Sequence, residues 1–392
     1  MSSIARSPAA LAFGGFLALA AAMGIGRFVY TPILPFMSEA LRLPADDAGL
    51  IASANFLGYL AGALIGASRS LPGSPRLWFL GGLLASALTS AAMALTTSLA
   101  AFLAIRFLSG IASAFVLVFS TTLILERLAG AGRTGLAALH FAGVGCGIAF
   151  SALLVSALAY LSADWRALWL ASGAGTLIFL GVSTLLVPSE NGGGPTQAAP
   201  ATTASKVPAS PFSSGNRIRL ILAYGLFGFG YVITATFVNA IARATPALQP
   251  TEPFVWLTVG LCSAPSIYLW NRAAARIGAR KAFALACVLE SAGVALTAIT
   301  LNPLLFLLGA ALLGATFMGI TALGLMEARR EVGADGPAAI RRMLAVLTAA
   351  FGIGQVAGPW FAGQLHHATG SFSAPSLAAA TALLVAAALV AR

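Results

Sequence analysis

The sequence is poor in charge and offers little polar surface of any kind. Asp, Glu, Lys and Arg together make up 8% of its 392 residues, while 59% are apolar and the mean hydropathy is +0.92. A water-soluble domain of this size needs a far larger charged surface, so a soluble enzyme or binding domain is excluded. Lipid must therefore be the solvent for much of the chain.

The chain also lacks the residue patterns of an enzyme, a metal site or a disulfide framework. Its three cysteines, Cys146, Cys262 and Cys287, lie in apolar stretches, and their odd number argues against a set of disulfides. His366 and His367 have no cysteine or carboxylate nearby, so we expect no metal site. There is no phosphate-binding loop, no His-Glu-x-x-His and no Gly-x-Ser-x-Gly motif. We expect no catalysis and no cofactor, and any work must draw on a gradient.

Long apolar segments recur from the beginning of the chain to its end. Each is long enough to cross a bilayer core of roughly 30 Å, and each is a continuous run rather than an alternating one. The sequence therefore predicts an all-α polytopic membrane protein with about 12 transmembrane helices. The first span is not a cleaved signal peptide, because its apolar stretch continues past Arg27 to Met37 and further spans follow. The predicted spans are residues 11–36, 47–68, 77–97, 100–125, 135–160, 166–187, 217–244, 253–271, 281–300, 303–327, 342–365 and 372–391.

One polar segment, residues 188–216, divides the chain. It is rich in Gly, Pro, Ser, Thr and Ala and is predicted to be a flexible linker between an N-terminal half, 1–187, and a C-terminal half, 217–392. The halves resemble each other: Gly24-Ile25-Gly26 matches Gly228-Phe229-Gly230 at an offset of 204, and similar matches follow in the same order. Two parallel six-helix halves are an architecture in which one half can rock against the other.

The net charge of +11 invites a nucleic-acid interpretation, but the placement of the charges explains it better. All but five of the 22 Lys and Arg lie in segments on the side of the N-terminus; the five are Arg27, Arg42, Arg106, Arg166 and Arg243. Basic loops face the cytoplasm in membrane proteins. We therefore expect both termini and the linker in the cytoplasm of a bacterium, the spans in its inner membrane, and no nucleic-acid partner.

Three motifs resemble the major facilitator superfamily of transporters. The loop Asn271–Lys281 resembles its basic signature between helices 8 and 9, although the counterpart at Ser68–Arg76 lacks the expected acidic residue. Arg106 stands four residues before Gly110, as in the superfamily's helix 4 pattern. Gly354-Gln355-Val356-Ala357-Gly358-Pro359 resembles a glycine-proline signature associated with antiporters. More narrowly, Gly24-Ile25-Gly26-Arg27-Phe28-Val29-Tyr30-Thr31-Pro32 is similar to the opening of the bacterial YbfB/YjiJ group, which implies transport but no particular cargo.

Two arginines inside the spans are the sharpest candidates for solute binding or coupling. A charge at membrane depth is costly unless it is paired or wetted, so Arg27 and Arg106 are functional hypotheses. In the superfamily fold both helices line a central cavity, where two guanidinium groups would bind a carboxylate. The alternative is that each arginine ties helix ends together through backbone carbonyls. Polar residues that we expect along the same pathway are Tyr30, Thr31, Asn55, Tyr59, Tyr231 and Asn239.

Further residues have more specific predicted roles. Glu290 and His140 are candidates for proton coupling, the alternatives being a neutral Glu290 hydrogen-bonded to a neighbouring helix and a structural His140. We expect a cytoplasmic gate at Glu126, Arg127, Glu327, Arg329, Arg272 and Arg280, in which Glu126 pairs beside Arg127 and Glu327 beside Arg329. Close helix packing is expected at Gly143, Gly145, Gly147, Gly354, Gly358 and Pro359.

These features together predict a monomeric secondary active transporter that moves a small solute by alternating access. A small organic anion, coupled to protons, is the leading cargo because of Arg27 and Arg106. A proton-antiport exporter of sugars or amphipathic drugs is the alternative, favoured by the glycine-proline signature. A transporter-like membrane receptor or scaffold is the alternative of another class.

Overall fold

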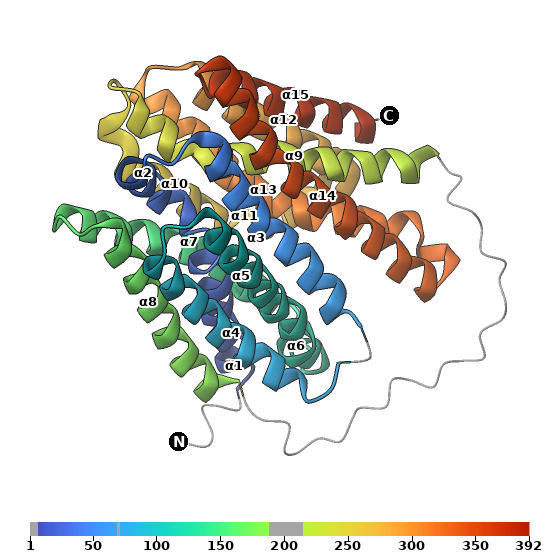
Figure 1. Cartoon of the computed structure of the whole chain (residues 1–392). Helices are drawn as coiled ribbons and strands as arrows, with labels where there is room; N and C mark the ends of the chain where they lie inside the picture. Colours follow the sequence, from blue (N-terminus) through green and yellow to red (C-terminus); the bar gives the residue numbers. More distant parts are fainter. Residues whose placement is uncertain (1–6, 69–70, 188–214, 392) are drawn as a thin grey trace.

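The computed structural model describes residues 7–68, 71–187 and 215–391, and every regular element within these ranges is helical (Figure 1). The helices of the N-terminal half are α1 (Pro8–Leu19), α2 (Tyr30–Leu41), α3 (Ala45–Gly66), α4 (Pro75–Ala92), α5 (Leu99–Ser120), α6 (Glu126–Gly130), α7 (Leu136–Tyr160) and α8 (Trp165–Leu186). Those of the C-terminal half are α9 (Gly215–Ala244), α10 (Glu252–Ser263), α11 (Ser266–Ile277), α12 (Ala279–Ile299), α13 (Pro303–Glu331), α14 (Pro337–Thr369) and α15 (Ser373–Ala391).

Eleven spans in the described ranges are long and apolar enough to cross a membrane, and a bent pair makes a twelfth. In the bent pair, α10 and α11 meet at 46° around Ala264 and Pro265. Proline has no N–H to donate and its ring crowds the preceding turn, so a single span over 253–271 is replaced by two helices. The predicted all-α fold in two six-helix halves is confirmed. The predicted linker, 188–216, lies outside the described residues except for Gly215 and Asn216, which begin α9.

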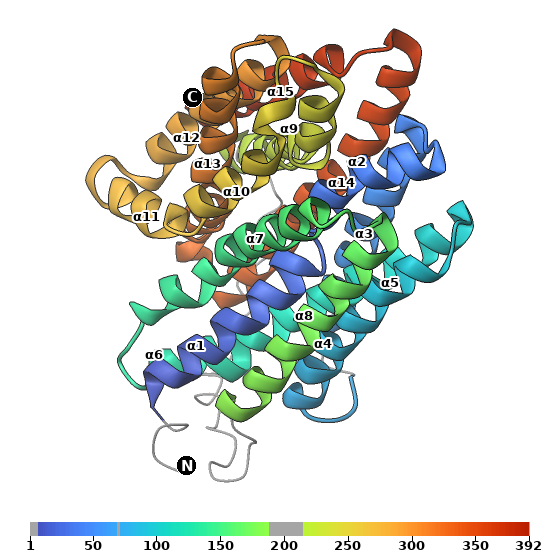
Figure 2. The ribbon, with the colours of Figure 1, turned by 90° about the vertical axis from the view of Figure 1, so that its left-hand side faces the viewer.

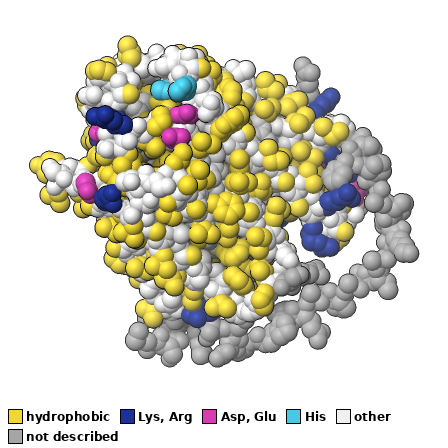
Figure 3. Space-filling view, viewed as in Figure 1, with side chains coloured by type: hydrophobic (Ala, Val, Ile, Leu, Met, Phe, Trp, Pro, Cys, Tyr) yellow, Lys and Arg dark blue, Asp and Glu magenta, His cyan; other side chains and the backbone are white. Residues whose placement is uncertain are grey.

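The outer surface of the bundle is apolar, as a lipid environment requires. Leu77, Ile178 and Leu304 are each more than half exposed, and hydrophobic side chains cover much of the face shown in Figure 3. Charged groups gather at the helix ends. We call the ends that carry Arg76, Arg127, Arg272 and Arg330 the basic face, and the ends that carry Arg42, Arg166 and Arg243 the opposite face.

The first span is broken ahead of its two prolines. Pro32 and Pro35 both lie within α2, whereas the break precedes it, in a π-helical turn over Ala20–Ile25 and a turn up to Val29. In this stretch Gly26 N donates to Ala21 O at 2.8 Å and Phe28 N donates to Met23 O at 3.1 Å, one residue further back than in an α-helix. Wide turns of this kind are often found at functional sites.

The internal repeat has a clear structural counterpart at the basic face. Arg76, at the start of α4, donates through Nη2 to Thr184 O at 3.1 Å and through Nε to Val187 O at 3.2 Å, at the end of α8. Arg280, at the start of α12, donates through Nε to Val390 O at 2.6 Å, in the last turn of α15. In each half, therefore, an arginine of the third span binds the carbonyls that end the sixth.

The two halves meet mainly along α3 with α14 and α7 with α10 (Figure 2), and α2 also packs against α9. The hydrogen bonds that join them within the described residues lie nearer the opposite face. Thr31 Oγ1 donates to Ala235 O at 2.6 Å, and Ser53 Oγ donates to Val356 O at 2.7 Å while it accepts from Trp360 N at 3.1 Å. Figure 1 shows the two bundles diverging from this contact toward the basic face.

Candidate functional site

Arg106 is fully enclosed and holds the break in the first span. Its Nη1 donates to Gly26 O at 3.2 Å and its Nη2 donates to Arg27 O at 3.0 Å. Ser109, one helical turn further along α5, donates to the same Gly26 carbonyl at 3.2 Å. The wide turn removes these carbonyls from the regular helical ladder, so they need donors from elsewhere. The guanidinium of Arg106 supplies those donors from α5.

Arg27 lies at the same break, but its guanidinium is held by aromatic rings. Its Cζ is 4.0 Å from the centroid of Tyr59, 4.7 Å from that of Phe56 and 5.4 Å from that of Phe28. The residue is only 4% exposed, its Nε and Nη2 have no hydrogen-bond partner, and none of the ion pairs within the described residues includes it. The two arginines therefore differ: Nη1 and Nη2 of Arg106 bind backbone carbonyls and only its Nε has no partner, whereas Arg27 has two nitrogens, Nε and Nη2, without a partner.

Aromatic side chains of the C-terminal half form the facing wall. Tyr231 of α9 stacks on Phe317 of α13, with ring centroids 5.6 Å apart, and on Phe351 of α14, at 5.9 Å. Its hydroxyl accepts a short hydrogen bond from Nε2 of Gln355. Arg27 is within electrostatic range of Tyr231, and the ring of Phe28 is 6.3 Å from that of Phe317. We call Arg27, Phe56 and Tyr59, with Tyr231 and Gln355 across the interface, the central site.

Several unpartnered polar atoms lie at the central site or on residues next to it. Besides the two nitrogens of Arg27, they include the Oε1 atom of Gln355 and the Oδ1 atom of Asn55, all buried. Buried polar groups almost always have a hydrogen-bond partner, so a cluster of exceptions calls for an explanation. A site that offers two donors beside two acceptors can bind a solute that carries both an anionic group and hydroxyl or amine hydrogens.

Four other residues predicted along the pathway make structural contacts. Tyr30 donates its hydroxyl to Ala48 O at 2.9 Å, and its ring lies 5.1 Å from the Cζ atom of Arg106. Asn55 Nδ2 donates to Arg106 O at 3.0 Å. Thr31 joins the two halves, as described above. Asn239 lies apart from the central site, where its Nδ2 donates to the backbone carbonyl of Glu252 at 3.3 Å.

The two proton-coupling candidates are buried in different halves. Both carboxyl oxygens of Glu290, on α12, lack a hydrogen-bond partner, so the alternative that it bonds to a neighbouring helix is wrong. Glu290 is within electrostatic range of Tyr231, which links it to the central site. His140 lies at the base of α7, where its Nε2 is 3.3 Å from Ser120 Oγ of α5 and its ring fills the space beside Gly15 of α1.

The predicted gate pairs at the basic face do not form as expected. Glu327 pairs with Arg330 instead of Arg329, with its carboxylate 3.0 Å from Nε and 3.1 Å from Nη2, because the i,i+3 spacing places these side chains on one helical face. None of the ion pairs in the described ranges includes Glu126 or Arg127. Arg272 donates to the hydroxyl of Tyr268 at 2.8 Å, and Arg280 holds the end of α15.

The ion pair that crosses between the halves lies at the opposite face. Arg243, near the end of α9, has its Nη1 3.3 Å from a carboxylate oxygen of Glu39, on α2. Its Nε donates to Glu252, on α10, at 2.9 Å. These residues fall at loop ends in the sequence, where charges are common, so nothing in the linear pattern indicates that they pair.

The predicted packing glycines lie at close helix crossings. A Cβ atom on Gly143 would overlap the backbone of α1 at Phe16, one on Gly147 would overlap Ala20 in the π-helical turn, and one on Gly354 would overlap Gly225 of α9. Gly358 faces the side chain of Val232 on α9. Gly145 instead faces Ala264, and Gly49 faces the carbonyl of Pro359, so both contacts join the two halves.

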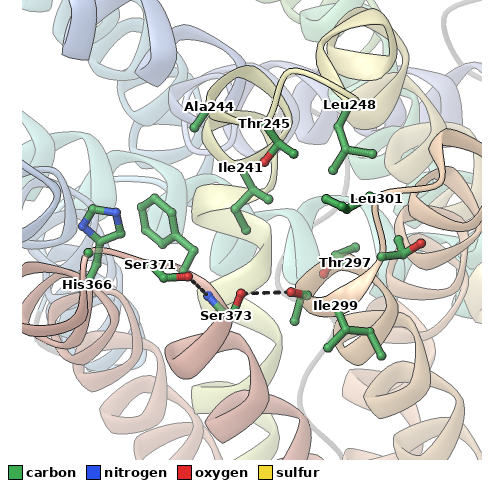
Figure 4. Close-up of a pocket in the computed structure, with 14 residues that line it drawn as sticks. Ile241, Ala244, Thr245, Leu248, Thr297, Ile299, Leu301, His366, Ser371 and Ser373 are labelled. Atoms are coloured by element: carbon green, nitrogen blue, oxygen red, sulfur yellow. Dashed lines mark hydrogen bonds between the residues drawn. The ribbon is translucent and has the colours of Figure 1, made fainter.

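A separate cavity of about 440 Å³ opens at the opposite face of the C-terminal half (Figure 4). His366 lies beside it with its ring 4.1 Å from that of Phe372, and Ser373 donates to Ala298 O at 3.1 Å. All its walls belong to one half, so a movement of the halves past each other neither opens nor closes it. We therefore do not assign it to a transported solute. No group of three potential metal ligands occurs within the described residues.

Comparison with known proteins identifies the family. Residues 19–391 match the family described as "Uncharacterised MFS-type transporter YbfB", where MFS denotes the major facilitator superfamily. The chain belongs to this family. It is thus a multi-pass membrane transporter, as the motifs around Arg27 and Arg106 indicate, and the predicted family is confirmed.

Solved structures support the same fold. The crystal structure of nucleoside transporter NupG is 18% identical, covers 98% of each chain and has a TM-score of 0.74. A crystal structure of a single-residue mutant of NupG is 17% identical, covers 97% of this chain and 99% of that chain, and also has a TM-score of 0.74. A search of curated proteins found no match. At these identities the structural similarity establishes the fold, and the solute depends on the site itself.

Proposed function

We propose that this transporter moves a small organic anion across the bacterial inner membrane by alternating access, coupled to protons. The observation that carries the proposal is the guanidinium of Arg27, which is buried at the interface of the halves with two nitrogens free. An unpaired charge in a membrane interior is costly and marks a pathway or binding site by default. A bound carboxylate would neutralise it and accept the two free N–H groups.

The three aromatic rings around Arg27 explain how its guanidinium is held in place although no carboxylate among the described residues pairs with it. Each ring face attracts a cation by about 0.5–2 kcal/mol, depending on desolvation, which offsets part of the cost of burial. Three rings therefore orient the guanidinium while its edge stays free for an anion. Arg106 then acts as a positioning residue, since its Nη1 and Nη2 are used by Gly26 O and Arg27 O.

Proton coupling is assigned to Glu290 in this proposal. The carboxyl is buried and unpartnered within electrostatic range of Tyr231, which faces Arg27. A carboxyl in such a place gains or loses its proton according to the charge beside it. A solute anion at Arg27 would then affect the proton on Glu290 through the intervening Tyr231. His140 is further from this pathway, against α1.

We infer the orientation from the basic loops, which place both termini in the cytoplasm. On that assignment the hydrogen bonds between the halves close the periplasmic end, and the bundles diverge toward the cytoplasm (Figure 1). We propose that the monomer is the transporting unit, because the central site is built from the two halves of one chain.

A thermal-stability screen tests the proposal. Purified protein in detergent is heated with lactate, succinate, gluconate, glucose, uridine and a lipophilic cation, each beside an Arg27→Ala variant. A solute that binds the folded state raises the melting temperature by mass action. We expect a carboxylate to stabilise the wild type and not Arg27→Ala. Stabilisation by neutral or cationic compounds alone would overturn the anion assignment.

A neutral, ring-bearing solute is the second candidate. It is favoured by the ring planes of Phe317 and Phe351, which lie 6° and 2° from parallel to that of Tyr231, and by the fold shared with a nucleoside transporter. Aromatic rings of a solute stack readily on such faces. In the same screen this candidate predicts stabilisation by uridine that persists in Arg27→Ala.

A further inference from the structure

A second cavity, of about 320 Å³, lies between the halves at the opposite face, and none of the residues of the central site lines it. Its walls come from α2 and α7 of the N-terminal half and from α9 and α10 of the C-terminal half. Its polar lining comes from Ser156 and Tyr160 of the N-terminal half and from Asn239, Arg243, Glu252 and Trp256 of the C-terminal half. Unlike the cavity of Figure 4, it changes shape whenever the halves move relative to each other.

Two buried polar groups on this lining have no partner within the described residues. Trp256 is 1% exposed and its Nε1–H has no acceptor, while Asn239 is 3% exposed and its Oδ1 has no donor. Leaving such groups without a partner is unfavourable, because no hydrogen bond offsets their desolvation. A donor and an acceptor on the wall of one cavity are complementary to a solute that presents an acceptor and a donor.

Arg243 adds a charge to this cavity, and its two carboxylate partners differ in distance and in exposure. Glu252 lies 2.9 Å from its Nε and is 14% exposed, whereas Glu39 lies 3.3 Å from its Nη1 and is 66% exposed. The guanidinium also stacks on Phe36, 3.9 Å from the ring centroid. An exposed ion pair of this kind contributes little to stability. Of the two carboxylates, Glu39 is therefore the one that another carboxylate can replace.

We propose that this cavity is a second binding site for a carboxylate-bearing solute. The solute's carboxylate takes the place of Glu39 on Arg243 and accepts from Trp256 Nε1, while a hydroxyl or amine group donates to Asn239 Oδ1. The solute class rests on the proposed function; the site itself rests on the cavity and its unpartnered groups. Exchange of one carboxylate for another leaves the local charge unchanged.

Binding at this site would also loosen the closure of the opposite face. Glu39 belongs to α2 and Arg243 to α9, so replacing Glu39 removes an ion pair that joins the halves. The site is adjacent to the central site, because the ring of Trp256 is 6.2 Å from that of Phe28, the neighbour of Arg27. A solute held there is separated from Arg27 by this aromatic pair.

The indole N–H of Trp256 reports directly on the site. The protein contains six tryptophans, so protein labelled with ¹⁵N-tryptophan gives a small set of indole signals, and Trp256→Phe identifies the one from the site. We expect lactate, succinate or gluconate to move this signal downfield, while potassium chloride at equal ionic strength does not. The Arg27→Ala variant should keep the response, because the central site is not needed for it.

A matched pair of variants tests the exchange at Arg243. Glu39→Gln removes the competing carboxylate and should lower the concentration for half-maximal response about threefold, the worth of an exposed pair. Asp164→Asn removes an equal charge from the opposite face, and asparagine also caps α8. It should leave the response unchanged. Equal effects of the two variants would mean that both act through the overall negative charge of the opposite face, and would overturn the proposed replacement of Glu39 by the solute's carboxylate.

The remaining outcomes separate this inference from the proposed function. A response lost in Arg27→Ala would assign the signal to the central site and overturn the second site. A silent Trp256 signal beside Arg27-dependent thermal stabilisation by the same acid would overturn the second site alone. Absence of both responses for every carboxylate would overturn both proposals.

Discussion

Replacement of each buried arginine by methionine separates a structural arginine from a functional one. Methionine is unbranched and of similar length, so Arg106→Met and Arg27→Met each remove a charge with little change in packing. The two guanidinium groups lie at the same break in the first span, and both residues are nearly fully buried. Their hydrogen bonds differ, and the stability of the variants should differ accordingly.

The magnitude follows from the contacts. Arg106→Met removes two charge-assisted hydrogen bonds of about 1.5–3 kcal/mol each and leaves the carbonyls of Gly26 and Arg27 short of donors. Part of this loss is offset because a buried charge no longer needs to be desolvated. A net loss of about 3 kcal/mol corresponds to a fall of about 6–12 °C for a domain the size of one half.

Arg27→Met should behave in the opposite way. The variant loses cation–π contacts to three rings but no ion pair and no bond from Nε or Nη2, and it also loses an unpaired charge. These terms oppose each other, so we expect a melting temperature within about 3 °C of the wild type. Stabilisation by carboxylates should disappear.

Heating followed by size-exclusion chromatography of the detergent-solubilised protein measures both effects, since it reports the fraction that remains monodisperse. Arg106→Lys keeps the charge but not the two-pronged geometry, and should fall between wild type and Arg106→Met. An Arg27→Met protein as unstable as Arg106→Met would refute the view that Arg27 is free for a ligand. An Arg106→Met protein of wild-type stability that binds no solute would place Arg106 in the binding site instead.

Two further predictions concern coupling and packing. Glu290→Gln is close to isosteric and removes no hydrogen bond. We therefore expect counterflow exchange of the solute in proteoliposomes to continue, while accumulation of the solute driven by a pH gradient is lost. Unchanged accumulation would exclude Glu290 as the proton carrier. Gly354→Leu should sharply reduce the yield of folded protein in detergent, because a side chain there meets the backbone of α9. Gly81→Leu should not reduce the yield, since no atom lies within 4 Å of a Cβ at Gly81. Equal yields of the two variants would refute the close crossing of α14 and α9.

The two arginines also show how much of the candidate site could be predicted from the sequence. Both were identifiable because a charge in an apolar span is rare and expensive. Their different roles were not, since the role depends on whether a backbone carbonyl or an aromatic face lies within reach. Gln355 and Phe56 carried no separate signal: one lay inside a glycine-proline motif and the other in an ordinary apolar run.

The predicted gate at the basic face shows the same limit, because the sequence does not show which charged side chains meet. Opposite charges lie close together in the sequence at two helix ends, Glu126 with Arg127 and Glu327 with Arg329. Side chains one or two positions apart on a helix point to different faces. Glu327 therefore pairs three residues away, with Arg330. The pair between Glu39 and Arg243 joins residues from two halves of the chain, and no local pattern predicts such a contact.

The sequence by itself determined the solvent, the number of spans, the division into halves and the family, because these depend on long runs of hydropathy and on repeated motifs. Only the tertiary structure decided which polar groups meet. Its decisive features were the break at Gly26, which exposed the carbonyls that Arg106 binds, and the three aromatic rings around Arg27, beside which its Nε and Nη2 have no partner in the described part of the chain. Both arise from packing between helices distant in the chain, where geometry rather than composition sets the energy.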